Sequence, residues 1–336
     1  MRFGMSGPVR ILALGLSMLA TPLWAECRGA DLMAALPAAE FAPIRAAADA
    51  VPFAVGNAWR ATRGDDEVIL VGTLHLDDAR FAPVMTALTP HLARSKLLLV
   101  EAGPKEQAEL KARLAKDPAL LVNTDGPTLP ELLPEAQWQA LSAALSARGV
   151  PGFMAAKFRP WYIAVLLSIP PCAMTAGLPN GLDQRLIEAA DDLGLPVAAL
   201  EPYDTAFKMF QDGTLAEQVT MLTGAIAAEA QSEDMSATMI ASYFAEDVRL
   251  SWEFTKVWTR SLPGYDPATA EAEFALMEGK LMNARNLAWI PVIEAAAENT
   301  DGPVFVAFGA LHLAGDQGVL ALLQQAGFKV ERIAFQ

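Results

Sequence analysis

The chain has 336 residues, of which 53% are apolar and 19% charged, and its formal net charge at pH 7 is −14. This length and apolar fraction provide for a large core in one or two domains, and they exclude a chain that is disordered throughout. The acidic balance excludes nucleic acid and anionic membrane surfaces as favoured partners.

The first 25 residues have the pattern of a secretory signal peptide. Arg2 and Arg10 form a positive start, residues 11–20 are an apolar run, and Ala25 supplies a small residue for cleavage. The apolar run is short for a membrane span of about 20 residues. We therefore expect cleavage after Ala25, no stable membrane span afterwards, and a periplasmic or secreted protein. An uncleaved membrane anchor is the alternative.

The chain has two cysteines, Cys27 and Cys172. In an oxidising compartment an even pair predicts one disulfide bond, which here joins the start of the mature chain to its middle. Two unpaired buried thiols are the alternative. With either outcome, the count excludes a metal site built from several cysteines.

Strand and helix patterns alternate along the mature chain. Strands are expected at 58–63, 67–72, 96–101, 197–201, 304–308 and 328–333, with a hairpin signal between the first two. Helices are expected at 81–93, 134–147, 161–169, 181–192, most of 205–299, and 315–325. Strands at both ends predict an α/β (α+β) fold in one domain, residues 26–336. Its central mixed sheet is built from both ends of the chain, is flanked by helices, and has a large helical insertion around 105–300.

The same four-residue phrase, Gly-x-Leu-His, closes two of the predicted strands. It ends at His75 and at His312, which are two of the three histidines in the chain. Open α/β sheets bind ligands at the carboxyl ends of their strands. Two histidines delivered to that edge predict a metal site, and two structural histidines are the alternative. The third histidine, His91, lacks this setting and is interpreted as a surface residue.

Three acids and one arginine are further candidate site residues. Glu101 ends a strand and is the predicted third metal ligand, because two histidines and one carboxylate leave room for water and substrate. A carboxylate that caps the following helix or faces solvent is the alternative. Glu201 also ends a strand, and Asp183 follows a glycine at a helix start, where capping is the alternative role. Arg285 lies on a mostly apolar helix and needs an acidic partner if it is buried; a surface position is the alternative.

These segments together resemble the TraB/GumN family. The most specific segment is Phe308-Gly-Ala-Leu-His-Leu-Ala-Gly-Asp-Gln-Gly-Val-Leu320, which continues to Gly327-Phe-Lys-Val330. The other matching segments, in chain order, are Val71-Gly-Thr-Leu-His75, Glu101, Gly181-Leu-Asp183, Leu200-Glu201 and Arg285-Asn286. The chain is also similar to the TIKI metalloproteases and, more distantly, to haem-binding ChaN-like and erythromycin-esterase-like folds.

The resemblance implies metal-dependent peptide cleavage, with a divalent ion for which manganese and cobalt are as suitable as zinc. It assigns the metal site to His75, Glu101 and His312, and it makes Arg285 the group that polarises a substrate or orients a ligand. Many relatives have an acid directly before this arginine. Here Ala284 stands in that place, which weakens a Glu–Arg pair at this point.

We therefore expect a metal-dependent hydrolase that acts on a peptide or small-molecule substrate. In this hypothesis Arg285 stabilises the developing oxyanion, and Glu201 or Asp183 carries the proton. The alternative is a haem- or metal-binding protein without turnover. A third interpretation is a non-catalytic signalling or plasmid-control factor with structural histidines.

Overall fold

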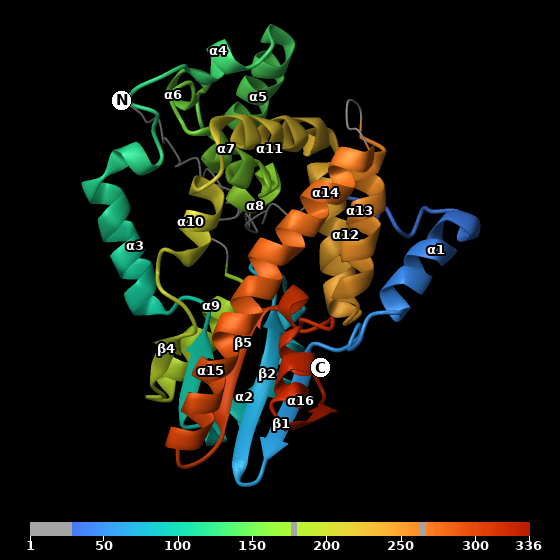
Figure 1. Cartoon of the computed structure of the whole chain (residues 1–336), viewed down its shortest axis with the longest axis vertical. Helices are drawn as coiled ribbons and strands as arrows, with labels where there is room; N and C mark the ends of the chain where they lie inside the picture. Colours follow the sequence, from blue (N-terminus) through green and yellow to red (C-terminus); the bar gives the residue numbers. More distant parts are fainter. Residues whose placement is uncertain (1–28, 176–179, 263–266) are drawn as a thin grey trace, which may run out of the picture.

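A computed structural model describes residues 29–175, 180–262 and 267–336 of the chain (Figure 1). Six strands form one mixed sheet in the order β4-β3-β5-β2-β1-β6. The strands are β1 (Ala58–Arg63), β2 (Asp66–Thr73), β3 (Leu97–Val100), β4 (Val197–Ala199), β5 (Val304–Gly309) and β6 (Lys329–Arg332). The predicted α/β fold, with a central mixed sheet built from both ends of the chain, is confirmed.

Four neighbouring strands run parallel, so their carboxyl ends meet at one edge of the sheet. Thr73 of β2 lies opposite Gly309 of β5. On the other side of β5, Val100 of β3 lies opposite Ala307, and β4 pairs in parallel with β3. β1 runs antiparallel to β2 after a two-residue turn in which Gly64 has a φ of 59°, a value that favours glycine. The predicted hairpin is therefore confirmed.

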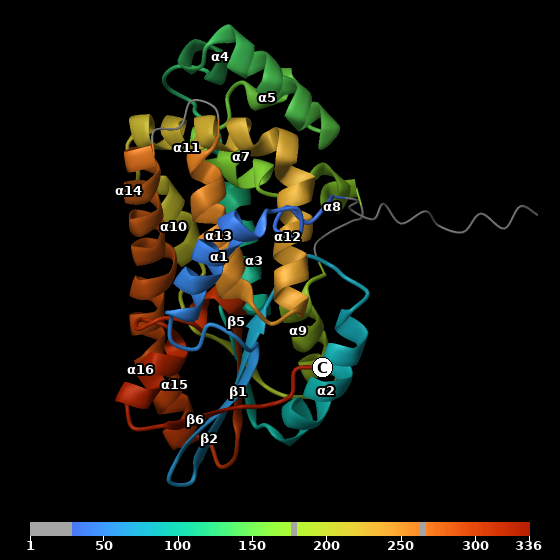
Figure 2. The same cartoon turned by 90° about the vertical axis from the view of Figure 1, so that its right-hand side faces the viewer.

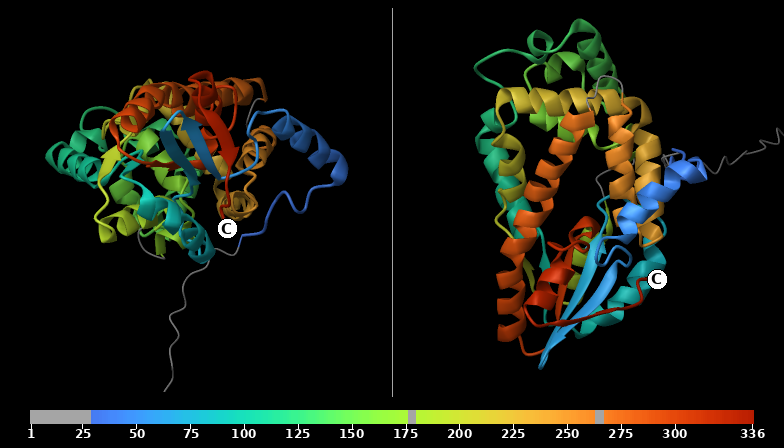
Figure 3. Two further views of the ribbon diagram at one scale, coloured as in Figure 1. Left: turned by 90° about the horizontal axis from the view of Figure 1, so that it is seen from below. Right: turned by 45° about the vertical axis from the view of Figure 1, so that its right-hand side comes forward.

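Helices cover both faces of the sheet. α2 (Phe81–Arg94) and α9 (Leu182–Asp192) pack on one face, and α15 (Ala284–Asn299) and α16 (Val319–Gln325) pack on the other. Figure 3 shows the strands between these two layers. Side chains alternate along a strand, so Ile69 and Val71 join the first core and Val68 and Leu70 the second. Burial on both faces explains the continuous apolar run of β2.

The remaining helices gather beyond the carboxyl ends of the parallel strands, as Figures 1 and 2 show. They are α3 (Pro104–Lys116), α4 (Leu129–Leu132), α5 (Glu135–Ala147), α6 (Gly152–Ala155), α7 (Pro160–Leu167), α8 (Pro171–Thr175), α10 (Thr205–Gln211), α11 (Leu215–Ala228), α12 (Ser232–Phe244), α13 (Val248–Arg260) and α14 (Pro267–Met277). Short 3₁₀ turns occur at η1 (Pro118–Leu120) and η2 (Glu229–Gln231). Buried side chains of α4, α5, α7 and α11 form a separate apolar cluster, so this part has a core of its own.

Some elements differ from the sequence prediction. Helix α1 (Ala38–Asp49) was not expected, and it packs on α13 through Ile44 and Ala48. The helix expected from residue 315 begins only at Val319, because Gly315 has a φ of 106° that no helix accepts. A π-helical turn, η3 (Glu278–Asn283), joins α14 directly to α15.

Two predictions fall on residues outside the described ranges. They are the signal peptide and the Cys27 end of the Cys27–Cys172 disulfide bond, and both stay predictions. No helix in the described part of the chain combines the length and the apolar character needed to cross a membrane.

Candidate functional site

The four parallel strands each deliver one predicted residue to the same edge. His75 follows β2, Glu101 follows β3, Glu201 follows β4, and β5 runs into a 3₁₀ turn, η4 (Ala310–His312), that ends at His312. His75, Glu101 and His312 line one cavity of about 470 Å³ together with Arg285 of α15. We call His75, Glu101, Glu201, Arg285 and His312 the strand-end cluster.

Two glycines allow the backbone segments around the histidines to approach each other. A Cβ atom on Gly72 would lie 2.8 Å from the Cα atom of Ala310 and 2.7 Å from Cδ1 of Leu313. A Cβ atom on Gly181 would lie 2.1 Å from the carbonyl oxygen of Leu74. Distances this short are overlaps, so only glycine fits at these two positions. The first glycine brings β2 against η4, and the second brings the start of α9 against the His75 segment.

His312 is buried, and its tautomer follows from its neighbours. Asn286 donates from Nδ2 to the carbonyl oxygen of Gln317 at 2.8 Å, so its Oδ1 atom faces His312 Nδ1 at 2.6 Å. Nδ1 must therefore be the donor, and Nε2 of the neutral ring carries a lone pair. Burial lowers the pKa of His312 to about 4; the charge of Glu101 opposes this shift, and the charges of Arg285 and His75 add to it.

His75 lies at the mouth of the cavity, with 67% of its side chain exposed. Its Nδ1 atom lies 3.0 Å from Oδ1 of Asp183, in the first turn of α9. This hydrogen bond raises the pKa of His75 to about 9, helped by the charges of Asp183 and Glu101. Solvent screens so exposed a pair. Asp183 orients His75 and forms no helix cap, because the capping position belongs to Gly181.

Arg285 forms the centre of the strand-end cluster, and the surface position considered for it is wrong. Its five N–H donors all have acceptors. Nε and Nη2 donate to the two carboxylate oxygens of Glu201 at 2.9 and 2.7 Å, and Nη2 also donates to Oε2 of Glu101. Nη1 lies 3.3 Å from both the Leu281 carbonyl oxygen and His312 Nε2. Two strand-end acids thus pair with Arg285 although Ala284 precedes it.

Glu101 is held as a carboxylate by its surroundings. Burial by itself raises its pKa. The charge of His312, which is protonated below pH ~4, the charges of Arg285 and His75, and the Gly309 amide outweigh burial and lower the pKa to about 2. The Gly309 N–H donates to Oε1 at 2.7 Å. Oε1 and Oε2 therefore accept from different donors, and the side chain is fixed in position.

Two further residues, for which the sequence predicted no role in the site, support the cluster. Asn286 fixes the tautomer of His312, and Trp289 donates from Nε1 to Oε2 of Glu201 at 3.0 Å. The Trp289 ring also lies 4.5 Å from the His312 ring and packs against the Arg285 guanidinium. Residues at i and i+4 share one helix face, so the spacing of Arg285 and Trp289 was the sequence signal that could have placed Trp289 beside the site.

The cluster contains donor types that divalent metal ions use, namely two imidazoles and a carboxylate. Each histidine has Nδ1 hydrogen-bonded to an oxygen atom, an arrangement that metal-binding histidines share because it leaves Nε2 for the metal. Glu101 adds an anionic oxygen ligand. Within residues 29–175, 180–262 and 267–336, however, no group of three or more His, Cys, Asp or Glu side chains has an arrangement that holds a metal ion. The Arg285 guanidinium contacts Glu101 and His312 instead.

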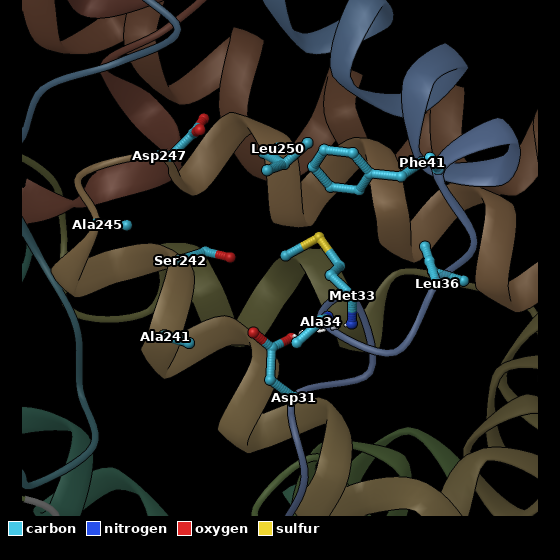
Figure 4. Close-up of a pocket in the computed structure, with 11 residues that line it drawn as sticks. Asp31, Met33, Ala34, Leu36, Phe41, Ala241, Ser242, Ala245, Asp247 and Leu250 are labelled. Carbon is cyan, nitrogen blue, oxygen red and sulfur yellow. Dashed lines mark hydrogen bonds between the residues drawn. The ribbon is translucent and has the colours of Figure 1, made fainter.

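A second cavity, of about 460 Å³, lies between α1, α12 and α13 (Figure 4). Apolar side chains such as Met33, Phe41 and Leu250 surround it, and no histidine lines it. Its carboxylates have structural partners: Asp31 accepts from the Met33 amide, and Asp247 accepts from a guanidinium on α1. We therefore assign the functional site to the cavity with the strand-end cluster.

Comparison with known proteins gives the same family as the sequence resemblance. A model of the TraB/PrgY/gumN family matches residues 57–332. The uncharacterized protein YbaP of Escherichia coli (strain K12) is 26% identical over 267 residues, which cover 78% of this chain and 89% of that protein. The YbaP protein of Shigella flexneri is 26% identical over 261 residues, which cover 76% of this chain and 87% of that protein.

Proposed function

The chain belongs to the TraB/PrgY/gumN family, and on that basis we propose a metal-dependent hydrolase that cleaves a peptide or related amide bond. One observation carries the proposal: two histidines, each anchored through Nδ1, and an ionised glutamate line the same cavity. We further propose that the protein acts outside the cytoplasm, on the basis of the signal-like residues 1–25.

His75 Nε2, His312 Nε2 and the Glu101 carboxylate are the groups that would hold the ion. Imidazole nitrogen and carboxylate oxygen suit zinc, cobalt and manganese. When bound, such an ion acidifies a water molecule and polarises the substrate carbonyl. Asp183 and Asn286 keep the two imidazoles in the orientation that their Nδ1 hydrogen bonds define.

Arg285 is the proposed donor to the developing oxyanion. Its contacts to Glu201 are short, whereas Nη1 makes the two longest contacts, at 3.3 Å, and is the nitrogen that turns most easily toward a substrate. Glu201, which also accepts from Trp289, is assigned to holding Arg285 in place. Asp183 lies at the open mouth of the site beside His75, so we assign the proton-carrying role to the Asp183 carboxylate.

A second candidate function is haem or metal binding without turnover. The observation that favours it is the full occupation of the five Arg285 donors, which leaves none directed at a substrate oxygen. Binding through the two histidines needs no such donor.

The test is the metal content of the purified protein after loading with manganese, cobalt or zinc. We expect near-stoichiometric metal in the wild-type protein and in the His91→Ala control, and loss of metal in the His75→Ala/His312→Ala double variant. Hydrolysis of a peptide library by the loaded protein then separates the hydrolase from the binding protein. Metal content that is equal in the double variant and the wild type would overturn a metal site at these histidines, and with it the metal-dependent hydrolase and the metal-binding function.

A further inference from the structure

The cavity has a polar end and an apolar wall. The polar end consists of His75, Glu101, Arg285 and His312, and no other charged side chain of the described chain lines the cavity. The wall comes from α10, α12, α13, η3 and η4, with Met209, Phe210, Met239, Trp252, Met282 and Leu311 among its side chains. Substrate groups beyond the polar end therefore meet an apolar, uncharged surface.

Trp252 has a buried donor without a partner. The residue is 9% exposed, and its indole Nε1 atom has no hydrogen-bond acceptor within the described residues. Buried tryptophan N–H groups ordinarily have a partner, because an unpaired buried donor is destabilising. The ring is held in place by an edge-on contact with Phe274, whose ring centre lies 5.4 Å away, and by packing with Met282. A fixed ring that lines the cavity and lacks an acceptor is suited to bind one from a ligand.

The charge of the site selects the kind of acceptor. An indole N–H only donates, so its partner is an acceptor, and the acceptors that a peptide always offers are carbonyl and carboxylate oxygens. Glu101 and Glu201 already place two acids beside Arg285, and the Arg285 donors are taken. In the metal-free protein His75 is paired with Asp183 and Arg285 with two glutamates, so a further carboxylate entering the cavity would be repelled. The partner that fits is the neutral carbonyl oxygen of a peptide or amide.

The wall is adaptable and joined to the polar end. Methionine side chains are flexible and polarisable, so Met209, Met239 and Met282 accommodate apolar groups of different shape. The π-helical turn η3 carries Met282 and also supplies the Leu281 carbonyl oxygen that accepts from Arg285. Turns of this type are frequent at functional sites. Here the turn fixes the distance between the wall and the arginine.

We propose that this cavity binds a neutral peptide or amide whose large apolar side chain packs on the methionine-rich wall and whose carbonyl oxygen accepts from Trp252. That the protein cleaves such a ligand beside its apolar side chain rests on the proposed function. That the cavity binds the ligand does not depend on it. The ligand class is thus an uncharged peptide segment with a residue such as leucine, methionine or phenylalanine.

The test uses N-acetyl amino-acid amides and isothermal titration calorimetry with the purified protein. We expect N-acetyl-leucine amide to bind about tenfold or more tightly than N-acetyl-serine amide, which is the ratio expected from burying a leucine side chain. N-acetyl-aspartate amide should not bind the metal-free protein. Equal affinities for the leucine and serine probes would overturn the proposal.

Two variants with matched controls test the residues. Trp252→Phe keeps a ring but removes the N–H, and we expect it to weaken binding of the leucine probe about fivefold. Trp258→Phe is the control: Trp258 lies on the same helix, but its N–H already donates to Gln231. Its removal should leave binding of the leucine probe unchanged. Met239→Lys places a charge on the wall and should abolish binding, whereas Met154→Lys, exposed and outside the cavity, should not.

Failure of this inference and failure of the proposed function give different results. If apolar amides bind and Trp252→Phe weakens them, but no metal supports cleavage of any peptide, the inference stands and the hydrolase proposal fails. If the loaded protein cleaves peptides without preference for an apolar residue beside the bond, the hydrolase stands and the inference fails.

Discussion

Replacement of Gly72 by alanine tests whether the two histidine segments approach each other as closely as the structure shows. The new Cβ atom would lie 2.8 Å from Ala310 Cα, and the backbone of η4 cannot move away as a flexible side chain can. Overpacking of this kind costs about 1–3 kcal/mol. Since the unfolding entropy of a chain of about 300 residues makes each kcal/mol worth about 1.5 °C in melting temperature, we expect Gly72→Ala to melt about 1.5–5 °C lower than the wild type.

Gly309→Ala is the matched control because it occupies the equivalent turn. Its Cβ atom would lie 3.4 Å from Glu101 Oε1 and 3.7 Å from His312 Cδ2, which are ordinary contacts, and its φ of −51° suits alanine. We expect a melting temperature that is unchanged or slightly higher, because alanine restricts the unfolded chain. Thermal unfolding followed by circular dichroism measures both variants. Equal melting temperatures for Gly72→Ala and Gly309→Ala would refute the close approach of β2 and η4.

Two further predictions concern the residues that hold the histidines. In the metal-free protein, Asp183→Asn should lower the pKa of His75 from about 9 toward its ordinary value near 6.5, followed by NMR titration of the ring protons. Because the folded-state pKa is raised, the His75–Asp183 pair stabilises the protein below pH ~6.5, and this stabilisation is lost as the pH rises toward ~9. An unchanged His75 titration in Asp183→Asn would contradict the pairing. Asn286→Ala should weaken metal binding about 10–100-fold in a competition assay. The exposed Asn299→Ala, at the far end of the same helix, should leave it unchanged.

Local sequence signals predicted the strands and turns that place the site. The pairing of side chains within the site depends on long-range contacts, which those signals do not contain. The apolar run of β2 and the turn at Gly64 are readable because periodicity and turn chemistry act over a few residues. The partner of Arg285 is not readable in this way. Glu201 lies 84 residues away, and it meets Arg285 only because β4, β3 and β5 are neighbours in the sheet. Helix α1 escaped prediction since its alanine-rich sequence has little apolar periodicity and contains Pro43.

The arrangement around Arg285 explains how a cluster of acids is stable before any ligand binds. Glu101 and Glu201 are largely buried, with 20% and 9% of their side chains exposed, and unpaired buried carboxylates are strongly destabilising. The Arg285 fork to Glu201 supplies the counter-charge. The contacts of Arg285 with two proposed metal ligands, Nη2 with Glu101 Oε2 and Nη1 with His312 Nε2 at 3.3 Å, are the ones to be exchanged for an ion. An ion held by Glu101 and His312 would therefore displace these two contacts of the arginine and leave its paired contacts with Glu201 in place. The same residue stabilises the metal-free fold and remains beside the reacting carbonyl in the proposed hydrolase.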